Sequence, residues 1–254
     1  MNGGVIAGVT CFSVDDKKGL TSLGPLRLIP QTENADPTTP PPGPLVLASD
    51  IVFNPSFTAV FIAVRSNGGK AGLVYAWPVV GGHVSTTPVV SSLPDLSIFF
   101  SFDFLGSDSR ILATNPHLNS PGAAFLDVSS SFAVTEEKII TIPQQVASCW
   151  IALAPQFDSA FIIDAGAPNI TIVSPETGAV KDIFHFNGTG AQDSRVDRTW
   201  LYTMNVPPMN PHVLVFDIQG LREGRSPKQV QSFDLFSALG PFPGYLGLSI
   251  YPSG

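Results

Sequence analysis

Four polar residues occupy equivalent places in a repeated pattern, each at the end of the second of two neighbouring apolar runs. They are Arg65, Asn115, Asp164 and Asn205. Amide and carboxylate oxygens bind divalent cations, and a guanidinium binds carboxylates. If the runs are equivalent strands, these side chains would form a ring of ligand-binding residues on one face. The alternative is that Asn and Asp only turn the chain at strand ends, which is their common role in β-proteins.

Two further residues are candidates for the same site. His117 lies in the loop after the second apolar run of its unit, where an imidazole could act as an acid or base. Trp150 lies on an expected inner strand, where it either faces a ligand channel or packs between sheets. The alternative for His117 is a surface histidine without a role. The remaining histidines, which look structural, are His83, His185 and His212.

Recognisable catalytic motifs are missing from the sequence. Neither G-x-S-x-G nor H-E-x-x-H occurs. The segment GTGAQD (188–193) resembles a glycine-rich phosphate loop, but no helical pattern follows it to supply the positive end of a helix dipole. The sequence therefore leaves the catalytic residues and any metal ligands unassigned, and it predicts no cofactor.

The elements that would position these residues follow from an internal repeat. The phrase IVFNPSFTAVFIAV consists of two apolar runs around a break. It occurs at 51–64 and returns, with the breaks aligned on Pro55, Gly106 and Pro155, at 102–115 and 151–164. A third apolar run follows each phrase, at 72–79, 123–128 and 169–174. A fourth copy keeps only the second and third runs, at 200–204 and 212–218, and a partial first copy covers 4–8 and 10–14.

Units of four short strands with turn residues at a constant phase predict the blades of a β-propeller. The more polar fourth strands are expected at 20–29, 138–143, 180–186 and 229–236, with a last apolar strand at 244–251. A β-sandwich is the alternative, but it does not explain the constant phase of the turn. The sequence thus predicts one all-β propeller domain over 1–254, with five to six blade units visible and N-terminal blades possibly missing. Proline lacks a backbone donor, so the segment 36–44 is expected to be an inter-blade connector.

Composition excludes several classes of protein. The net charge of −7 and the lack of a Lys/Arg-rich run argue against nucleic acid as a partner. Every apolar run is shorter than the roughly 18–20 residues that span a bilayer, and the first residues lack the pattern of a signal peptide. Cys11 and Cys149 lie in apolar contexts, as free thiols or as a disulfide pair. Asn169 and Asn187 begin N-glycosylation sequons, which matter only in a secreted protein.

The order of several segments resembles a known family. TCFSV, TTPPPGP, VFNPSFTAVFIAV, IPQQVASCWIALAP, FIIDAG and KQVQSFDL together resemble the secreted fungal proteins called 3-carboxymuconate cyclase-like, in the seven-bladed lactonase and muconate lactonizing enzyme superfamily. The resemblance covers essentially the whole chain, although such relatives carry about two further blades and a signal peptide. It implies a fungal extracellular or surface protein of binding, antigen or adhesin type, with a host-surface or other protein as partner. The alternative is a lactonase or cycloisomerase acting on a small carboxylated substrate at the channel mouth. No catalytic residue of those enzymes could be carried over to a position here.

Overall fold

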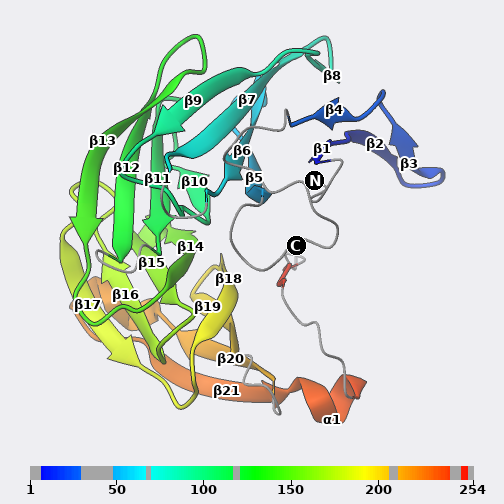
Figure 1. Ribbon diagram of the computed structural model, residues 1–254. Coiled ribbons are helices and arrows are strands. Elements are labelled where there is room, and N and C mark those ends of the chain that lie inside the picture. The colour runs from blue at the N-terminus through cyan, green and yellow to red at the C-terminus, as the bar shows by residue number, and fades with distance from the viewer. Residues whose placement is uncertain are drawn as a thin grey trace. The chain divides into compact units, whose positions relative to one another are not determined.

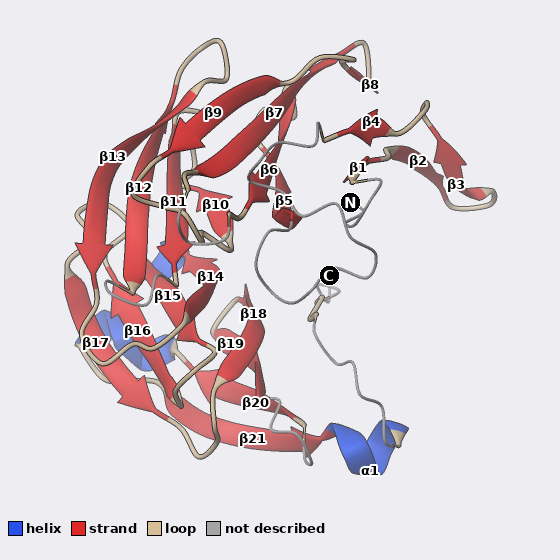
Figure 2. Ribbon diagram, in the orientation of Figure 1, coloured by secondary structure: helices blue, strands red, loops and turns tan. Residues whose placement is uncertain are grey.

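The computed structural model describes residues 7–29, 48–66, 70–116, 121–205, 211–240 and 247–250. Nearly all of its regular structure is strand, and the three helices have five residues or fewer (Figure 2). The chain divides into two compact units, residues 1–112 with 125–139 and residues 113–124 with 140–254. The expected connector 36–44 and the candidate His117 lie outside the described residues.

The first unit contains the sheet formed by the repeat phrase at 51–64 (Figure 1). Its strands are β5 (Ala48–Phe53), β6 (Ala59–Val64), β7 (Gly72–Val80), β8 (His83–Val84) and β9 (Val89–Leu93). β5 pairs with β6 and β6 with β7, and β8 and β9 each pair with β7, all antiparallel. The predicted inner hairpin is therefore confirmed, and β9 is the fourth strand for which the sequence showed no clear candidate.

The turn between β5 and β6 is organised by one asparagine. Asn54 is buried, and its Oδ1 accepts a hydrogen bond from the backbone N–H of Ala59 at 2.8 Å. Its Nδ2 donates to Oγ1 of Thr58 at 2.9 Å. Phe57 completes the turn in the left-handed region, with φ 56°. The side chain of Asn54 thus holds both ends of the turn in place, which explains why a Pro-containing break between two apolar runs forms a tight hairpin.

Three further sheets have four strands each, in chain order. The first consists of β10 (Phe102–Phe104), β11 (Arg110–Asn115), β12 (Gly122–Val128) and β13 (Val134–Thr141). The next consists of β14 (Ser148–Ala154), β15 (Ser159–Asp164), β16 (Asn169–Val173) and β17 (Val180–His185), with the short helix η1 (Pro155–Phe157) between β14 and β15. The last consists of β18 (Ala191–Asp197), β19 (Trp200–Asn205), β20 (His212–Asp217) and β21 (Lys228–Asp234), with η2 (Gln219–Glu223) before β21 and α1 (Leu235–Leu239) after it. Four strands connected in sequence order form the pattern of a propeller blade, as predicted.

Two predicted strands differ from the structure. The segment 20–29 forms two strands instead of one, because Gly24 takes φ 149° and Pro25 follows it. β3 (Gly19–Ser22) pairs with β2 (Phe12–Asp15), whereas β4 (Arg27–Leu28) pairs with β1 (Gly8–Val9). In the predicted last strand, 244–251, the described residues 247–250 are not strand, and Leu248 donates its N–H to Oδ2 of Asp193 at 2.9 Å.

β18 was missed by the sequence pattern because it is a polar inner strand. Its sequence is AQDSRVD, yet Asp193 and Ser194 are buried. The Ser194 hydroxyl forms a hydrogen bond with the Thr203 hydroxyl on β19. Polar groups are tolerated in the interior when they find partners, and those partners cannot be read from a single segment of sequence.

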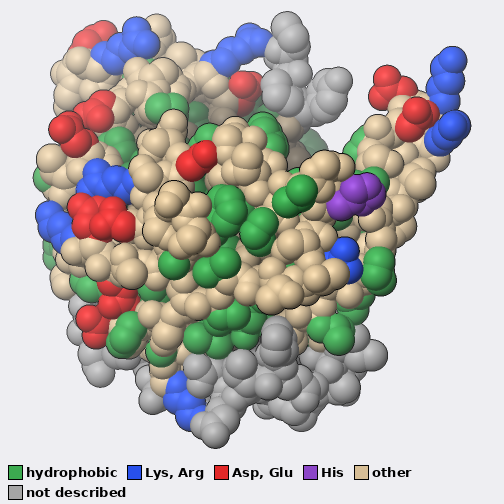
Figure 3. Space-filling model, turned by 90° about the horizontal axis from the view of Figure 1, so that it is seen from above, with side chains coloured by type: hydrophobic (Ala, Val, Ile, Leu, Met, Phe, Trp, Pro, Cys, Tyr) green, Lys and Arg blue, Asp and Glu red, His purple; other side chains and the backbone are tan. Residues whose placement is uncertain are grey.

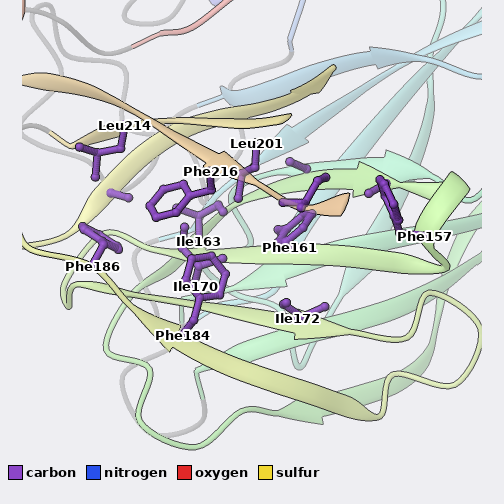
Figure 4. Packing of buried hydrophobic residues seen from close by; sticks show 14 residues of the cluster. Phe157, Phe161, Ile163, Ile170, Ile172, Phe184, Phe186, Leu201, Leu214 and Phe216 are labelled. Atoms are coloured by element: carbon purple, nitrogen blue, oxygen red, sulfur yellow. The ribbon is translucent and has the colours of Figure 1, made fainter. Parts of the chain in front are cut away.

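The core of the second unit joins the sheets β14–β17 and β18–β21 (Figure 4). Phe161 and Ile163 of β15 belong to the same buried cluster as Phe216 of β20. The rings of Phe184 and Phe216 lie 5.3 Å apart in an edge-to-face arrangement. Burying an aromatic or large aliphatic side chain contributes about 1.5–3 kcal/mol, so this cluster fixes the two sheets against each other. Phe157 of η1 lies at one end of the cluster.

The first unit has its own core. Tyr75 and Trp77 of β7 are stacked, with ring centroids 5.6 Å apart, and both are fully buried. Val9 and Ile29, which belong to or flank the strand pair β1–β4, join the same cluster. Arg27 adds a polar contact, because its Nη2 donates to the carbonyl of Val84 at 2.9 Å. The N-terminal strands are thereby attached to the sheet that follows them.

Candidate functional site

The four strand-end residues occupy equivalent positions, as the repeat predicts. Asn115, Asp164 and Asn205 are the last residues of β11, β15 and β19, and Arg65 directly follows β6. All four are buried, with at most 5% of their surface exposed. Arg65 belongs to the first compact unit and the other three belong to the second. The ring that would join all four remains a prediction.

Asp164 is a structural anchor. Its Oδ2 accepts the N–H of Val146 at 2.7 Å, and its Oδ1 accepts the N–H of Ala147 and of Gly166, each at 2.8 Å. A fourth bond, from the N–H of Ala167 to Oδ1, measures 3.2 Å. A carboxylate offers about four acceptor sites, and here the backbone supplies four donors. The structural alternative therefore accounts for Asp164, whose oxygens join the turn after β15 to the segment before β14.

The other strand-end side chains are also in the interior. Asn205 donates from Nδ2 to the carbonyl of Asn187 at 3.5 Å, whereas its Oδ1 has no partner among the described residues. The guanidinium of Arg65 lies over the ring of Phe100, with Cζ 4.3 Å from the ring centroid. Asn115 is 2% exposed. These positions are turned into the fold and do not present a set of exposed polar groups.

The electrostatics of the described residues do not single out the strand ends. Burial raises the pKa of the Cys11 thiol and the pKa of the Glu136 carboxyl. Hydrogen bonds from Ser237, at its side chain and its backbone, lower the pKa of Asp234. None of these three groups is at a strand-end position. Within the described ranges, no three residues among His, Cys, Asp and Glu are grouped to hold a metal ion.

The remaining predicted site residues have different surroundings. Trp150 packs against the core cluster of the second unit. Asn187 is exposed in the turn after β17, whereas Asn169 is buried and its Nδ2 donates to the carbonyl of Gln144 at 3.0 Å. A glycan on Asn169 would have to break that bond and leave the interior, so Asn187 is the acceptor site compatible with the fold. Cys11 and Cys149 are both free thiols.

A pocket of about 450 Å³ lies at the opposite ends of β15 and β19, away from Asp164 and Asn205. It is lined by Gln156, Phe157, Arg198, Thr199, Gln219 and Arg222. These residues come from η1, from the β18–β19 turn and from η2, three segments of the two sheets that share the core. The pocket was not foreseen from the sequence because nothing in three separate turns marks them as neighbours.

The pocket is built on fixed turns. Gln156 donates from Nε2 to the carbonyl of Arg198 at 2.6 Å, which ties η1 to the β18–β19 turn. The guanidinium of Arg222 lies over the ring of Phe157, with Cζ 5.3 Å from the ring centroid. The N–H of Gln219 is bound by Oδ1 of Asp217 at 2.9 Å, so η2 also has an anchored start. The pocket combines an aromatic wall, two guanidiniums and three neutral polar side chains.

The surface and the helices add two observations. On the face shown in Figure 3, Lys and Arg side chains are interspersed with Asp and Glu, and the described residues form no continuous basic patch there. The helices within the described ranges are too short to cross a bilayer, and none of them qualifies as a membrane span. Nucleic acid is disfavoured as a partner chiefly by the negative charge of the whole sequence.

Comparison with known proteins shows likeness of structure only. No protein-family model matches the chain, and no curated protein matches its sequence. A Bacteroides uniformis protein assigned as a 6-phosphogluconolactonase is similar with a TM-score of 0.66 and 13% identity, over 91% of this chain and 65% of that one. Saccharomyces cerevisiae Sqt1 is similar with a TM-score of 0.58 and 12% identity, over 91% of this chain and 56% of that one.

A Lactobacillus plantarum protein is similar with a TM-score of 0.55 and 14% identity, over 87% of this chain and 61% of that one. The chain thus spans less than two thirds of the length of each of these three proteins. Likeness at such low identity shows the fold and does not carry activity across. Together with the repeated four-stranded sheets, it shows that the chain is an all-β protein with a β-propeller fold of the lactonase-like type.

Proposed function

We propose that this chain is a ligand-binding β-propeller of a fungal cell surface or extracellular space, and that its strand ends serve architecture instead of catalysis. One observation carries the proposal: the carboxylate of Asp164 uses its acceptor sites on four backbone N–H groups. A general acid or base must exchange a proton with the substrate, and a carboxylate filled in this way is poorly suited to do so. The resemblance to secreted carboxymuconate cyclase-like proteins supports the extracellular location.

A lactonase or cycloisomerase is the second candidate. The likeness to a protein assigned as a 6-phosphogluconolactonase favours it. Such an enzyme would hold a substrate carboxylate with a cation and move a proton with a nearby acid or base. Arg65 could supply the cation, although its guanidinium is buried against Phe100.

A turnover assay separates the two functions. We expect the purified chain to leave the hydrolysis rate of 6-phosphogluconolactone and the level of cis,cis-muconate at their buffer values, because the strand-end carboxylate is occupied. The measurement follows lactone loss by proton release and muconate by absorbance, over a range of protein concentrations. Turnover that rises in proportion to protein, and that Arg65→Ala abolishes without unfolding the chain, would establish the enzyme instead.

The location has its own test. We expect an antibody to the chain to detect it in the culture medium or the wall fraction of the source organism, in a form whose mobility increases after glycosidase treatment. Asn187→Gln should abolish that shift, because Asn187 is the exposed sequon, whereas Asn169→Gln should leave it unchanged. Detection in the cytosol alone, without a glycan, would contradict the proposed location.

A further inference from the structure

We propose that the pocket lined by Arg198 and Arg222 binds a small organic dicarboxylate. The inference deepens the proposed binding function by naming a ligand class, and to that extent it rests on it. The site itself is separate from the strand-end residues, because it lies at the other ends of β15 and β19. No residue of the pocket was among the candidates drawn from the sequence.

Arg222 is placed to receive an anion. Among the described residues it forms no ion pair. Its guanidinium lies over the face of Phe157, a ring that is 8% exposed. Contact with an aromatic face uses the flat side of the guanidinium and leaves its N–H edge available. That edge matches the two oxygens of a carboxylate and binds them through parallel hydrogen bonds.

Arg198 supplies the second cation from a different turn. It lies in the two-residue turn of the β18–β19 hairpin, between the paired residues Asp197 and Trp200. Its φ of 52° is in the left-handed region, which suits Gly or Asn better than a long side chain. Residues held in unfavourable backbone conformations cluster at functional sites, and this one is at the edge of a pocket. Its carbonyl, bound by Gln156, fixes where the turn lies.

Three acidic residues near the pocket are already engaged. Asp158 pairs with Lys181, whose Nζ lies 2.9 Å from Oδ2. Glu223 pairs with Arg225 at 2.6 Å. The Oδ1 of Asp217 accepts the N–H of Gln219. Each of these carboxylates therefore has a partner of its own, and none of them is paired with a pocket arginine.

Size and chemistry restrict the ligand. The volume of about 450 Å³ is within the range of small-molecule sites and accommodates a dicarboxylic acid of a few carbons. Two guanidiniums from separate turns can each bind one carboxylate, while Gln156, Thr199 and Gln219 can donate hydrogen bonds beside them. The net charge of −7 opposes a polyanion, so a compact dianion is favoured over a nucleic acid.

Titration with succinate, glutarate and adipate tests the site, because these acids differ in the distance between their two carboxylates. We expect at least one of them to bind one equivalent per chain, measured by calorimetry at low salt. Arg222→Ala and Arg198→Ala should each weaken that binding at least tenfold. Arg222→Lys should weaken it less, since it keeps the charge and loses the paired hydrogen bonds. The uncharged diamide of the same length should not bind.

Arg225→Ala is the matched control. Arg225 is three residues from Arg222, is exposed and has its own partner in Glu223, so its removal should change the affinity less than twofold. An equal loss in Arg225→Ala and Arg222→Ala would overturn the proposal, because it would indicate a general effect of surface charge.

The absence of saturable binding by all three acids would also overturn the proposal, as would binding of the diamide. Tighter binding of inorganic phosphate than of every dicarboxylate would overturn the ligand class. The diamide and phosphate comparisons use the unsubstituted chain, so they hold even if a variant fails to fold. The turnover assay is independent, since the pocket can bind a dicarboxylate whether or not a lactone is hydrolysed elsewhere.

Discussion

Replacement of Asp164 by alanine should lower the free energy of unfolding by at least about 3 kcal/mol, because it leaves four buried backbone N–H groups without their acceptor. Each bond joins the turn after β15 to itself or to the segment before β14. Urea denaturation followed by tryptophan fluorescence measures the loss, with a second probe to confirm a two-state transition. Asp164→Asn should fall between wild type and alanine, since its amide keeps one oxygen and turns a donor toward an N–H.

Asp217→Ala provides the matched control, because Asp217 accepts one backbone N–H, that of Gln219 at 2.9 Å. Its removal should cost about 0.5–1.5 kcal/mol, the ordinary value for one hydrogen bond. The comparison also decides between the two interpretations of Asp164. A variant that unfolds normally, within about 1 kcal/mol of wild type, but loses a ligand would return Asp164 to the list of binding residues.

The blades could be predicted from sequence because their information is local. Pro55, Gly106 and Pro155 recur at one phase between two apolar runs, and the corresponding turns do connect adjacent antiparallel strands. β18 could not be predicted in this way. Asp193 and Ser194 give it the composition of a loop, and the partners that make it a strand lie on β19 and in the segment 247–250.

The site was less predictable than the fold for the same physical reason. The repeat placed Asp164 correctly at the end of a strand, but the chemistry of its carboxylate depends on Val146 and Ala147, which approach it only in the folded chain. Arg198 and Arg222 have no shared motif and are 24 positions apart (222 − 198). They become neighbours through the packing of two sheets around a common core, and side-chain packing across sheets has no signature in a single strand.

The turn held by Asp164 also presses against the start of the next blade, at Gly190. A Cβ built on Gly190 would lie 2.2 Å from the carbonyl oxygen of Ala165 and 2.7 Å from its carbonyl carbon. Both atoms are backbone, and Ala165 is itself fixed by a hydrogen bond from its N–H to the carbonyl of Ala147 at 2.8 Å. The only residue that fits this approach without moving backbone is glycine.

Gly190→Ala should therefore lower the free energy of unfolding by about 3 kcal/mol, at the upper end of overpacking effects, because the turn or the start of β18 has to shift. Gly247→Ala is the control: its Cβ would meet nothing closer than Oδ2 of Asp193 at 4.0 Å, so its effect should stay within about 0.5 kcal/mol. The double variant with Asp164→Ala tests the coupling. A turn released from its carboxylate can move away from the methyl group introduced at Gly190, so the combined loss should be smaller than the sum by more than about 0.5 kcal/mol. Strict additivity would show that the anchor and the close contact act independently.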